Sequence, residues 1–150
     1  RNGTHEEHKT PSRASRNHHA IYRRHPEIGA VVNAYTVNAT AFGVTSAEFS
    51  SRTIPESYIF LRDVSRIPYG IQFTDSEDLA SRISLEQPIA LLENDGVLVT
   101  GASVLQTFDR LEVLESTAEA LVNSRPLKGV APMSETVIEE LREAFLKPAS

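Results

Sequence analysis

Two short apolar runs separated by a four-residue polar turn are the feature that most constrains this chain. In the stretch ALLENDGVLVTG (residues 90–101), the apolar segments 89–92 and 97–100 flank the turn ENDG at positions 93–96. An Asp-Gly pair between apolar runs is a favoured hairpin sequence, so the stretch predicts two adjacent strands. The carboxylate of Asp95 leaves two interpretations of the tip open, namely turn formation and contact with a ligand in a binding site.

Strands and helices alternate along the rest of the chain, which favours an α/β layered architecture. The segment AVVNAY (30–35) is typical of a buried strand, and Pro26 ends the helix expected before it. Thr74 and Glu77 form a capping-box pattern, while Ser103 and Ser134 are expected N-caps of later helices. The other expected elements are a helix that opens at Ser12, a helix over 38–49, strands over 52–61 and 64–69, and a helix over 74–84.

The two helices nearest the C-terminus are expected to be amphipathic, because apolar residues recur in them at the helical period. The first expected stripe consists of Val104, Phe108, Leu111, Leu114, Ala118 and Leu121, and the second consists of Val137, Leu141 and Phe145.

Composition excludes several classes of function. The formal net charge is −5 and the 15 Lys and Arg residues are scattered, whereas a nucleic-acid-binding domain needs a basic face. Cysteine is absent, which excludes disulfides and thiolate sites. No apolar run approaches the roughly 20 residues of a membrane span, so we expect a cytoplasmic protein with no membrane partner. We further expect a polar tail over residues 1–10, with His5 and His8 in solvent, and one domain over residues 11–147.

Polar residues on the first expected strand suggest a site. Asn33 and Tyr35 are two residues apart, so both side chains point to the same face of a sheet and could supply two metal ligands or two substrate contacts. Any strand offers this spacing, so its meaning depends on the surrounding sequence.

The order and the residues of four segments resemble the class II aldolase/adducin family. Typical members of this family are zinc-dependent sugar-phosphate aldolases such as L-fuculose-phosphate aldolase. The matching segments are PSRASRNHHAIYRRHPEIGAVVNAYTVNAT, IPYG, ALLENDGVLVTG and FDRLEVLESTAEA. The resemblance implies a three-layer α/β/α sandwich with a central, mainly antiparallel sheet, assembled as an oligomer. It also implies that three histidines hold zinc as a Lewis acid while a carboxylate moves the proton.

Residue by residue, this chemistry does not carry over. The resemblance places Asn33 and Tyr35 where the family has two zinc histidines, Asp95 where it has the third, and Ala14 where it has the acid/base glutamate. Alanine cannot carry a proton, and a tyrosine hydroxyl that titrates near 10 is a poor zinc ligand at neutral pH. We therefore expect no metal and no cofactor at this position, although the family uses zinc there.

The phosphate-binding serine pair of the family is half kept, since Ser12 remains and Arg13 replaces the second serine. A serine at a helix N-terminus can bind an anion, so Ser12 and Arg13, with Asn33 and His18, are the candidate substrate-binding residues for a phosphorylated sugar. The alternative for Ser12 and Arg13 is an N-cap followed by surface arginines. For His18, the alternative is a partly buried, hydrogen-bonded residue. Compared with the family, the N-terminal portion of the fold is missing, so we expect it to be supplied by the same protein or by association.

Three functions remain open. The first is a degenerate aldolase-like domain that forms the structural or regulatory half of a larger assembly, lending residues such as Arg62, Asp63, Arg66 or Tyr69 to a neighbour. The second is a lyase-like enzyme with altered chemistry, in which Tyr35 is the proton donor and Asp95 the base. The third is an interaction module like the adducin branch of the family, because fold alone does not fix function.

Overall fold

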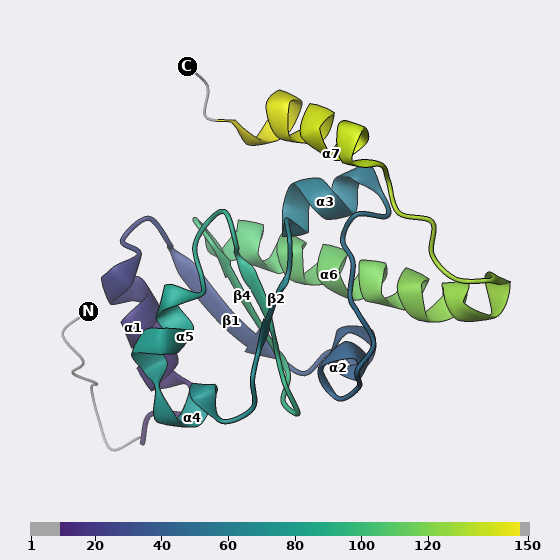
Figure 1. Cartoon of the computed structure of the whole chain (residues 1–150). Helices are drawn as coiled ribbons and strands as arrows, with labels where there is room; N and C mark the ends of the chain where they lie inside the picture. The colour runs from purple at the N-terminus through teal and green to yellow at the C-terminus, as the bar shows by residue number, and fades with distance from the viewer. Residues whose placement is uncertain (1–9, 148–150) are drawn as a thin grey trace.

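The computed structural model describes residues 10–147, in which helices surround one small sheet (Figure 1). The strands are β1 (Ala30–Ala34), β2 (Ser65–Ile67), β3 (Ile89–Leu92) and β4 (Val97–Gly101). The helices are α1 (Ser15–Arg24), α2 (Val37–Gly43), α3 (Pro55–Leu61), α4 (Ile71–Thr74), α5 (Ser76–Ser81), α6 (Val104–Ser124), α7 (Glu135–Leu141), the 3₁₀ turn η1 (Arg125–Leu127) and the π-helical turn η2 (Arg142–Leu146).

The four strands form one mixed sheet in the order β1-β4-β3-β2. β4 pairs antiparallel with both β1 and β3, which confirms the hairpin predicted around residues 93–96. β2 pairs parallel with β3 at the other edge. The predicted architecture, a mainly antiparallel sheet between helical layers, is confirmed.

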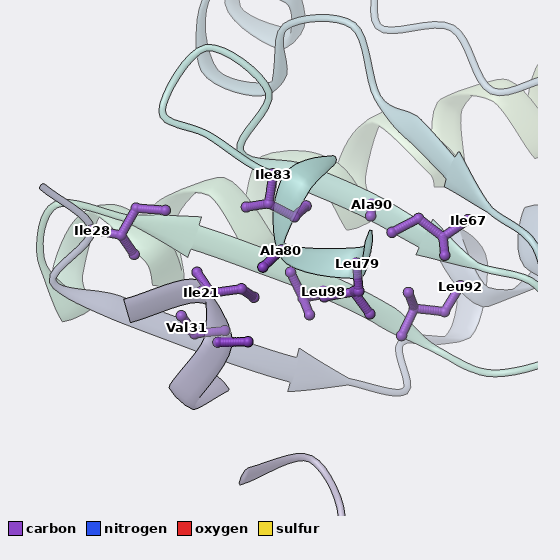
Figure 2. Packing of buried hydrophobic residues seen from close by; sticks show 11 residues of the cluster. Ile21, Ile28, Val31, Ile67, Leu79, Ala80, Ile83, Ala90, Leu92 and Leu98 are labelled. Atoms are coloured by element: carbon purple, nitrogen blue, oxygen red, sulfur yellow. The ribbon is translucent and has the colours of Figure 1, made fainter. Parts of the chain in front are cut away.

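Helices cover both faces of the sheet, which explains why the hairpin strands are continuously apolar (Figure 1). Alternate residues of β3 enter different cores, because successive side chains of a strand point to opposite faces. Ala90 and Leu92 pack in the cluster beneath α1 and α5 (Figure 2), and Ile89 and Leu91 pack in the cluster beneath α2 and α6. The two faces of the sheet are thus each covered by a separate hydrophobic core.

Two of the predicted caps are confirmed. The hydroxyl of Ser103 accepts a hydrogen bond from the Gln106 N–H, and Ser134 accepts one from the Val137 N–H, so α6 and α7 begin where the sequence places them. Gln106 also accepts the N–H of Ala102, the residue before the N-cap, through Oε1, which ties the incoming chain to the first turn of α6.

Other local expectations are wrong. The expected strand over 52–61 is the helix α3, in which Pro55 occupies the first turn, where proline has no hydrogen bond to lose. The capping pattern at Thr74 is displaced by one residue, because Asp75 accepts the Asp78 N–H and caps α5, while the Thr74 hydroxyl donates to the Gly70 carbonyl. The first helix begins at Ser15, after a turn in which Ser12 Oγ accepts the Ala14 N–H.

The apolar stripes of the last two helices are only partly buried. Leu114, Ala118 and Leu121 lie in the core, but Val104 and Phe108 are 74% and 53% exposed. On α7 the buried residue is Ile138, whereas Phe145 beyond it is exposed. No helix within residues 10–147 is both long and apolar enough to cross a membrane. The tail expected over residues 1–10, with His5 and His8, lies outside the described residues except for Thr10.

Candidate functional site

The fold brings the predicted residues together at one end of the sheet, where β1 ends and the β3–β4 turn reverses the chain. β1 carries Asn33, and Tyr35 follows its last residue. His18 on α1 faces Asn33, with Nε2 of His18 2.7 Å from Oδ1 of Asn33. An amide oxygen only accepts hydrogen bonds, so this contact fixes a proton on Nε2 and orients the ring.

Tyr35 and Asp95 form the second contact of the site. The Tyr35 hydroxyl forms a hydrogen bond with the Asp95 carboxylate. This bond, together with the negative charge of Asp95, raises the pKa of the Tyr35 phenol above its ordinary value, although the positive charge of Arg13 opposes the effect. Tyr35 therefore keeps its proton at neutral pH and acts as a hydrogen-bond donor. Its side chain is 77% exposed, so the pair is accessible from solvent.

Gln72 is a site residue that the sequence reasoning missed. Its Nε2 lies 3.3 Å from Oδ2 of Asp95, and its Oε1 accepts the Gly70 N–H at 3.1 Å. Because the amide oxygen is already occupied by the backbone, the amide nitrogen is the end that faces Asp95. Gln72 is only 6% exposed, and the one sequence signal was an amide inside the apolar segment GIQF.

Asn17, also missed, holds Gln72 in place. Its buried side chain donates to the Gln72 carbonyl at 2.9 Å and accepts the Ser76 hydroxyl at 2.9 Å. These two bonds tie α4 and α5 to α1 beneath the site. On α1, Asn17 thus supports the site from below, and its neighbour His18 contacts the site residue Asn33.

The β3–β4 turn uses its polar residues for different purposes. Glu93 serves the structure, because its carboxylate pairs with Arg66 Nε at 3.0 Å and accepts the Tyr69 N–H at 3.3 Å. Asn94 takes the left-handed conformation of the turn, with φ of 52°. Gly96 is required by packing, since a Cβ there would lie 2.2 Å from the Ala34 carbonyl oxygen. Asp95 alone points its side chain to the site residues.

Arginine and exposed aromatic rings border this group. Arg13 lies over the Phe73 ring at 5.9 Å, and Phe73 meets Tyr69 edge to face with 5.8 Å between ring centroids. Ser12 is exposed and bonded to its own turn through the Ala14 N–H. Arg13 thus stands close enough to Tyr35 to affect its titration, while Ser12 lies in the turn that carries Arg13.

The residues at the three positions expected to hold zinc are a poor donor set. Asn33 Oδ1 accepts a hydrogen bond from His18, and Tyr35 keeps its proton at neutral pH. The Asp95 carboxylate already accepts hydrogen bonds from Tyr35 and Gln72. A zinc centre needs at least three nitrogen, sulfur or oxygen ligands free to face one point. Asp95 and the second ring nitrogen of His18 are the strong donors here, so the residues do not fit the three-histidine centre implied by the resemblance.

Comparison with known families identifies the scaffold. The sequence profile of the Class II Aldolase and Adducin N-terminal domain matches residues 2–122 of the chain. The chain belongs to this family.

Two curated class II relatives and one solved structure illustrate the similarity. An L-fuculose phosphate aldolase of Methanococcus vannielii is 30% identical over 103 residues, which cover 68% of this chain and 55% of that protein. A 3-oxo-tetronate 4-phosphate decarboxylase of Haemophilus influenzae is 28% identical over 137 residues, covering 87% and 64%. The crystal structure of YgbL from Escherichia coli, described as a putative aldolase/epimerase/decarboxylase, matches with a TM-score of 0.78 and 27% identity, covering 91% of this chain and 68% of that one. The chain therefore spans a little more than half of the length of the curated aldolase relative.

Proposed function

We propose that this chain is a degenerate class II aldolase-like domain that binds a phosphorylated sugar or sugar acid without the zinc centre of its family. The observation that carries the proposal is the hydrogen-bonded group at the former ligand positions. His18 bonds to Asn33, and Tyr35 and Gln72 bond to Asp95, so protein partners satisfy side chains that a metal would otherwise engage. The proton-carrying position is Ala14, which has no group to transfer.

The surroundings of this group support ligand binding. Arg13 supplies a guanidinium, which suits a phosphate because it can donate two parallel hydrogen bonds. The exposed rings of Tyr35, Tyr69 and Phe73 offer apolar surface to the faces of a sugar. The names of the curated relatives specify phosphorylated substrates for both an aldolase and a decarboxylase.

We further propose that the domain works within a larger assembly, formed with copies of itself or with the N-terminal portion of the fold. Support comes from the start of α6, where Val104, Leu105 and Phe108 are 74%, 70% and 53% exposed. Contiguous apolar surface of this kind marks interaction sites in many soluble proteins. Association would cover it.

A second function, catalysis with altered chemistry, has one specific observation in its favour. The Tyr35 hydroxyl is protonated, exposed and hydrogen-bonded to the Asp95 carboxylate, which is an arrangement able to donate a proton to a substrate oxygen. In this alternative Asp95 is the base that removes a proton from the substrate while Tyr35 donates its own to the substrate oxygen, and Asn33 and His18 position the substrate.

Calorimetry with L-fuculose 1-phosphate tests the proposal and separates the two functions. We expect the purified chain to bind the sugar phosphate, Arg13→Ala to weaken binding about tenfold through loss of a charged hydrogen bond, and no aldehyde or carbon dioxide to be released. The matched control is Arg24→Gln, which removes an exposed arginine at the other end of α1. Turnover that is lost in Tyr35→Phe and Asp95→Asn would establish the enzyme instead. Absence of binding in the parent protein would overturn the proposed ligand.

A further inference from the structure

A cavity lies at the opposite end of β3 from the candidate site. Its volume is about 480 Å³, which is within the range of small-molecule sites. Its lining comes from α3 and α7, which lie side by side in Figure 1, from η2, and from the loop over residues 84–87 that leads into β3. Lining side chains include Tyr58, Arg62, Gln87 and Arg142.

Arginines gather around Tyr58 at this cavity. The guanidinium groups of Arg52 and Arg142 each lie 5.7 Å from the centroid of the buried Tyr58 ring. Arg142 Nε donates to the Tyr58 hydroxyl at 2.7 Å, and within residues 10–147 the hydroxyl proton itself has no acceptor. Tyr58 is therefore a free hydrogen-bond donor on the cavity wall.

Arg62 is the unpaired member of this group. Its guanidinium makes no hydrogen bond or ion pair with the described residues, and its Nε is buried without a partner. Arg110, whose own guanidinium donates to the Thr100 carbonyl at 2.8 Å, lies close enough that the two positive charges repel. Burial lowers the pKa of Arg62, and burial together with the charge of Arg62 lowers that of Arg110. The positive charges of Arg62 and Arg110 thus disfavour each other, and no ion pair within residues 10–147 compensates Arg62.

Three carboxylates, those of Asp63, Glu86 and Glu139, also line the cavity, and two of them pair with neighbouring arginines. Asp63 is shared by Arg52 and Arg142, at 2.9 and 3.6 Å, and Glu139 pairs with Arg142 at 3.4 Å. Glu86 faces Arg62 at longer range, where its charge has a small effect and forms no ion pair. The lining thus carries three cations (Arg62, Arg142 and Lys147) and three carboxylates, and among these cations Arg62 is the one without an ion pair within residues 10–147.

Backbone geometry also sets Arg62 apart. Its φ of 59° and ψ of −157° are close to a region that is favourable for glycine and strained for other residues. The Ser51 hydroxyl donates to the Arg62 carbonyl at 2.5 Å and holds this conformation. The facing wall includes the π-helical turn η2, a form found frequently at functional sites. Arg62 therefore combines an unfavourable backbone conformation with charge repulsion from Arg110 at the wall of the cavity.

We propose that the cavity between α3, α7 and residues 84–87 is an oxyanion-binding site, with Arg62 as the main donor and the Tyr58 hydroxyl as the second. The ligand carries a phosphate or carboxylate group, which accepts two parallel hydrogen bonds from a guanidinium. This site goes beyond the proposed function, because it lies across the sheet from Arg13 and uses different residues.

Thermal melting of the purified chain in chloride, phosphate and acetate at equal ionic strength tests the proposal. We expect phosphate or acetate, but not chloride, to raise the melting temperature of the parent protein. A response to phosphate assigns a phosphate ligand and a response to acetate assigns a carboxylate. Arg62→Gln should weaken binding about tenfold or more, as expected for a charged hydrogen bond, and should raise the melting temperature in chloride because it removes the repulsion with Arg110.

A second variant keeps the test decisive if glutamine disturbs the loop. Arg62→Gly suits the backbone conformation, so it should melt above the parent in chloride and lose the response to the anion. Arg24→Gln, on exposed surface of α1, is the matched control and should retain the parent response.

Amide NMR shifts separate this site from the one at Arg13. Shifts at residues 62 and 84–87 on addition of phosphate or acetate, absent in Arg62→Gln, support the inference. Shifts confined to residues 12–14, or no response to either anion, would overturn it, and the former result would leave the proposed sugar-phosphate site intact.

Discussion

The two ends of β3 present polar side chains in opposite states. At the Asp95 end, the residues of the candidate site bond to one another: His18 to Asn33, and both Tyr35 and Gln72 to Asp95. At the other end, the Arg62 guanidinium has no partner among the described residues and is repelled by Arg110. A group whose hydrogen bonds are complete gains little from a metal, whereas a partly buried cation without an ion pair gains much from an anion. We therefore expect little metal binding at the Asp95 end and anion binding at Arg62.

Stability at the Asp95 end depends on a partly buried glutamate that anchors α2 to α6. Glu115 on α6 accepts the backbone N–H groups of Asn38 and Ala39 at 2.7 and 2.9 Å, and α2 in turn supports the turn through the bond from the Asn94 N–H to the Gly43 carbonyl. Glu115→Gln keeps the shape but removes the charge, so we expect a loss of about 1–3 kcal/mol in the free energy of unfolding. Denaturation with urea measures it.

The pH dependence of that loss provides the control. Burial alone would raise the pKa of Glu115, but the hydrogen bonds from Asn38 and Ala39 outweigh it and lower the pKa below its ordinary value of 4.5. A lowered pKa contributes stability that is present above the unfolded value and is lost as the pH falls through the folded value. The parent protein should therefore lose stability below about pH 4.5 more steeply than Glu115→Gln; parallel curves would show that the carboxylate is not the anchor.

A smaller effect is expected from Asp95→Asn. The variant removes the negative charge that raises the pKa of Tyr35, so the phenol should titrate at a lower pH than in the parent. Ultraviolet absorbance of the phenolate measures this shift, with Tyr69→Phe as a background to remove a neighbouring exposed tyrosine. Because Tyr35 is largely exposed, the stability of the protein should change little. An unchanged titration would mean that the Tyr35–Asp95 contact does not exist in solution.

Much of the fold could be predicted from the sequence where local and tertiary signals agree. The hairpin strands, the strand over 30–35 and the caps at Ser103 and Ser134 follow from apolar runs and from side chains that satisfy nearby N–H groups. The strand expected over 52–61 is wrong because its apolar residues suit a strand or a helix equally, and Pro55 fits the first turn of a helix. Val104 and Phe108 belong to the expected apolar stripe but are exposed. A periodic stripe shows which residues share a helix face without showing how far the neighbouring core extends.

The candidate site was predictable in part. The positions of Asn33, Tyr35 and Asp95 came from the resemblance, and the fold brings them to one end of the sheet with His18. Gln72 and Asn17 could not be predicted, because their roles depend on α4 packing against α1, a contact between segments 55 residues apart. Arg62 was singled out only as a loop residue, since neither its unpaired charge nor its backbone conformation is visible in the sequence.

The central claim is that the class II scaffold persists here while its zinc ligands have been replaced by side chains that hydrogen-bond to one another. The most direct measurement is zinc content by mass spectrometry after equilibration with zinc, for the parent protein and for the triple variant Asn33→His, Tyr35→His and Asp95→His. We predict no stoichiometric zinc in the parent and one ion per chain in the variant. Stoichiometric zinc in the parent that is lost in Asp95→Asn would contradict the claim.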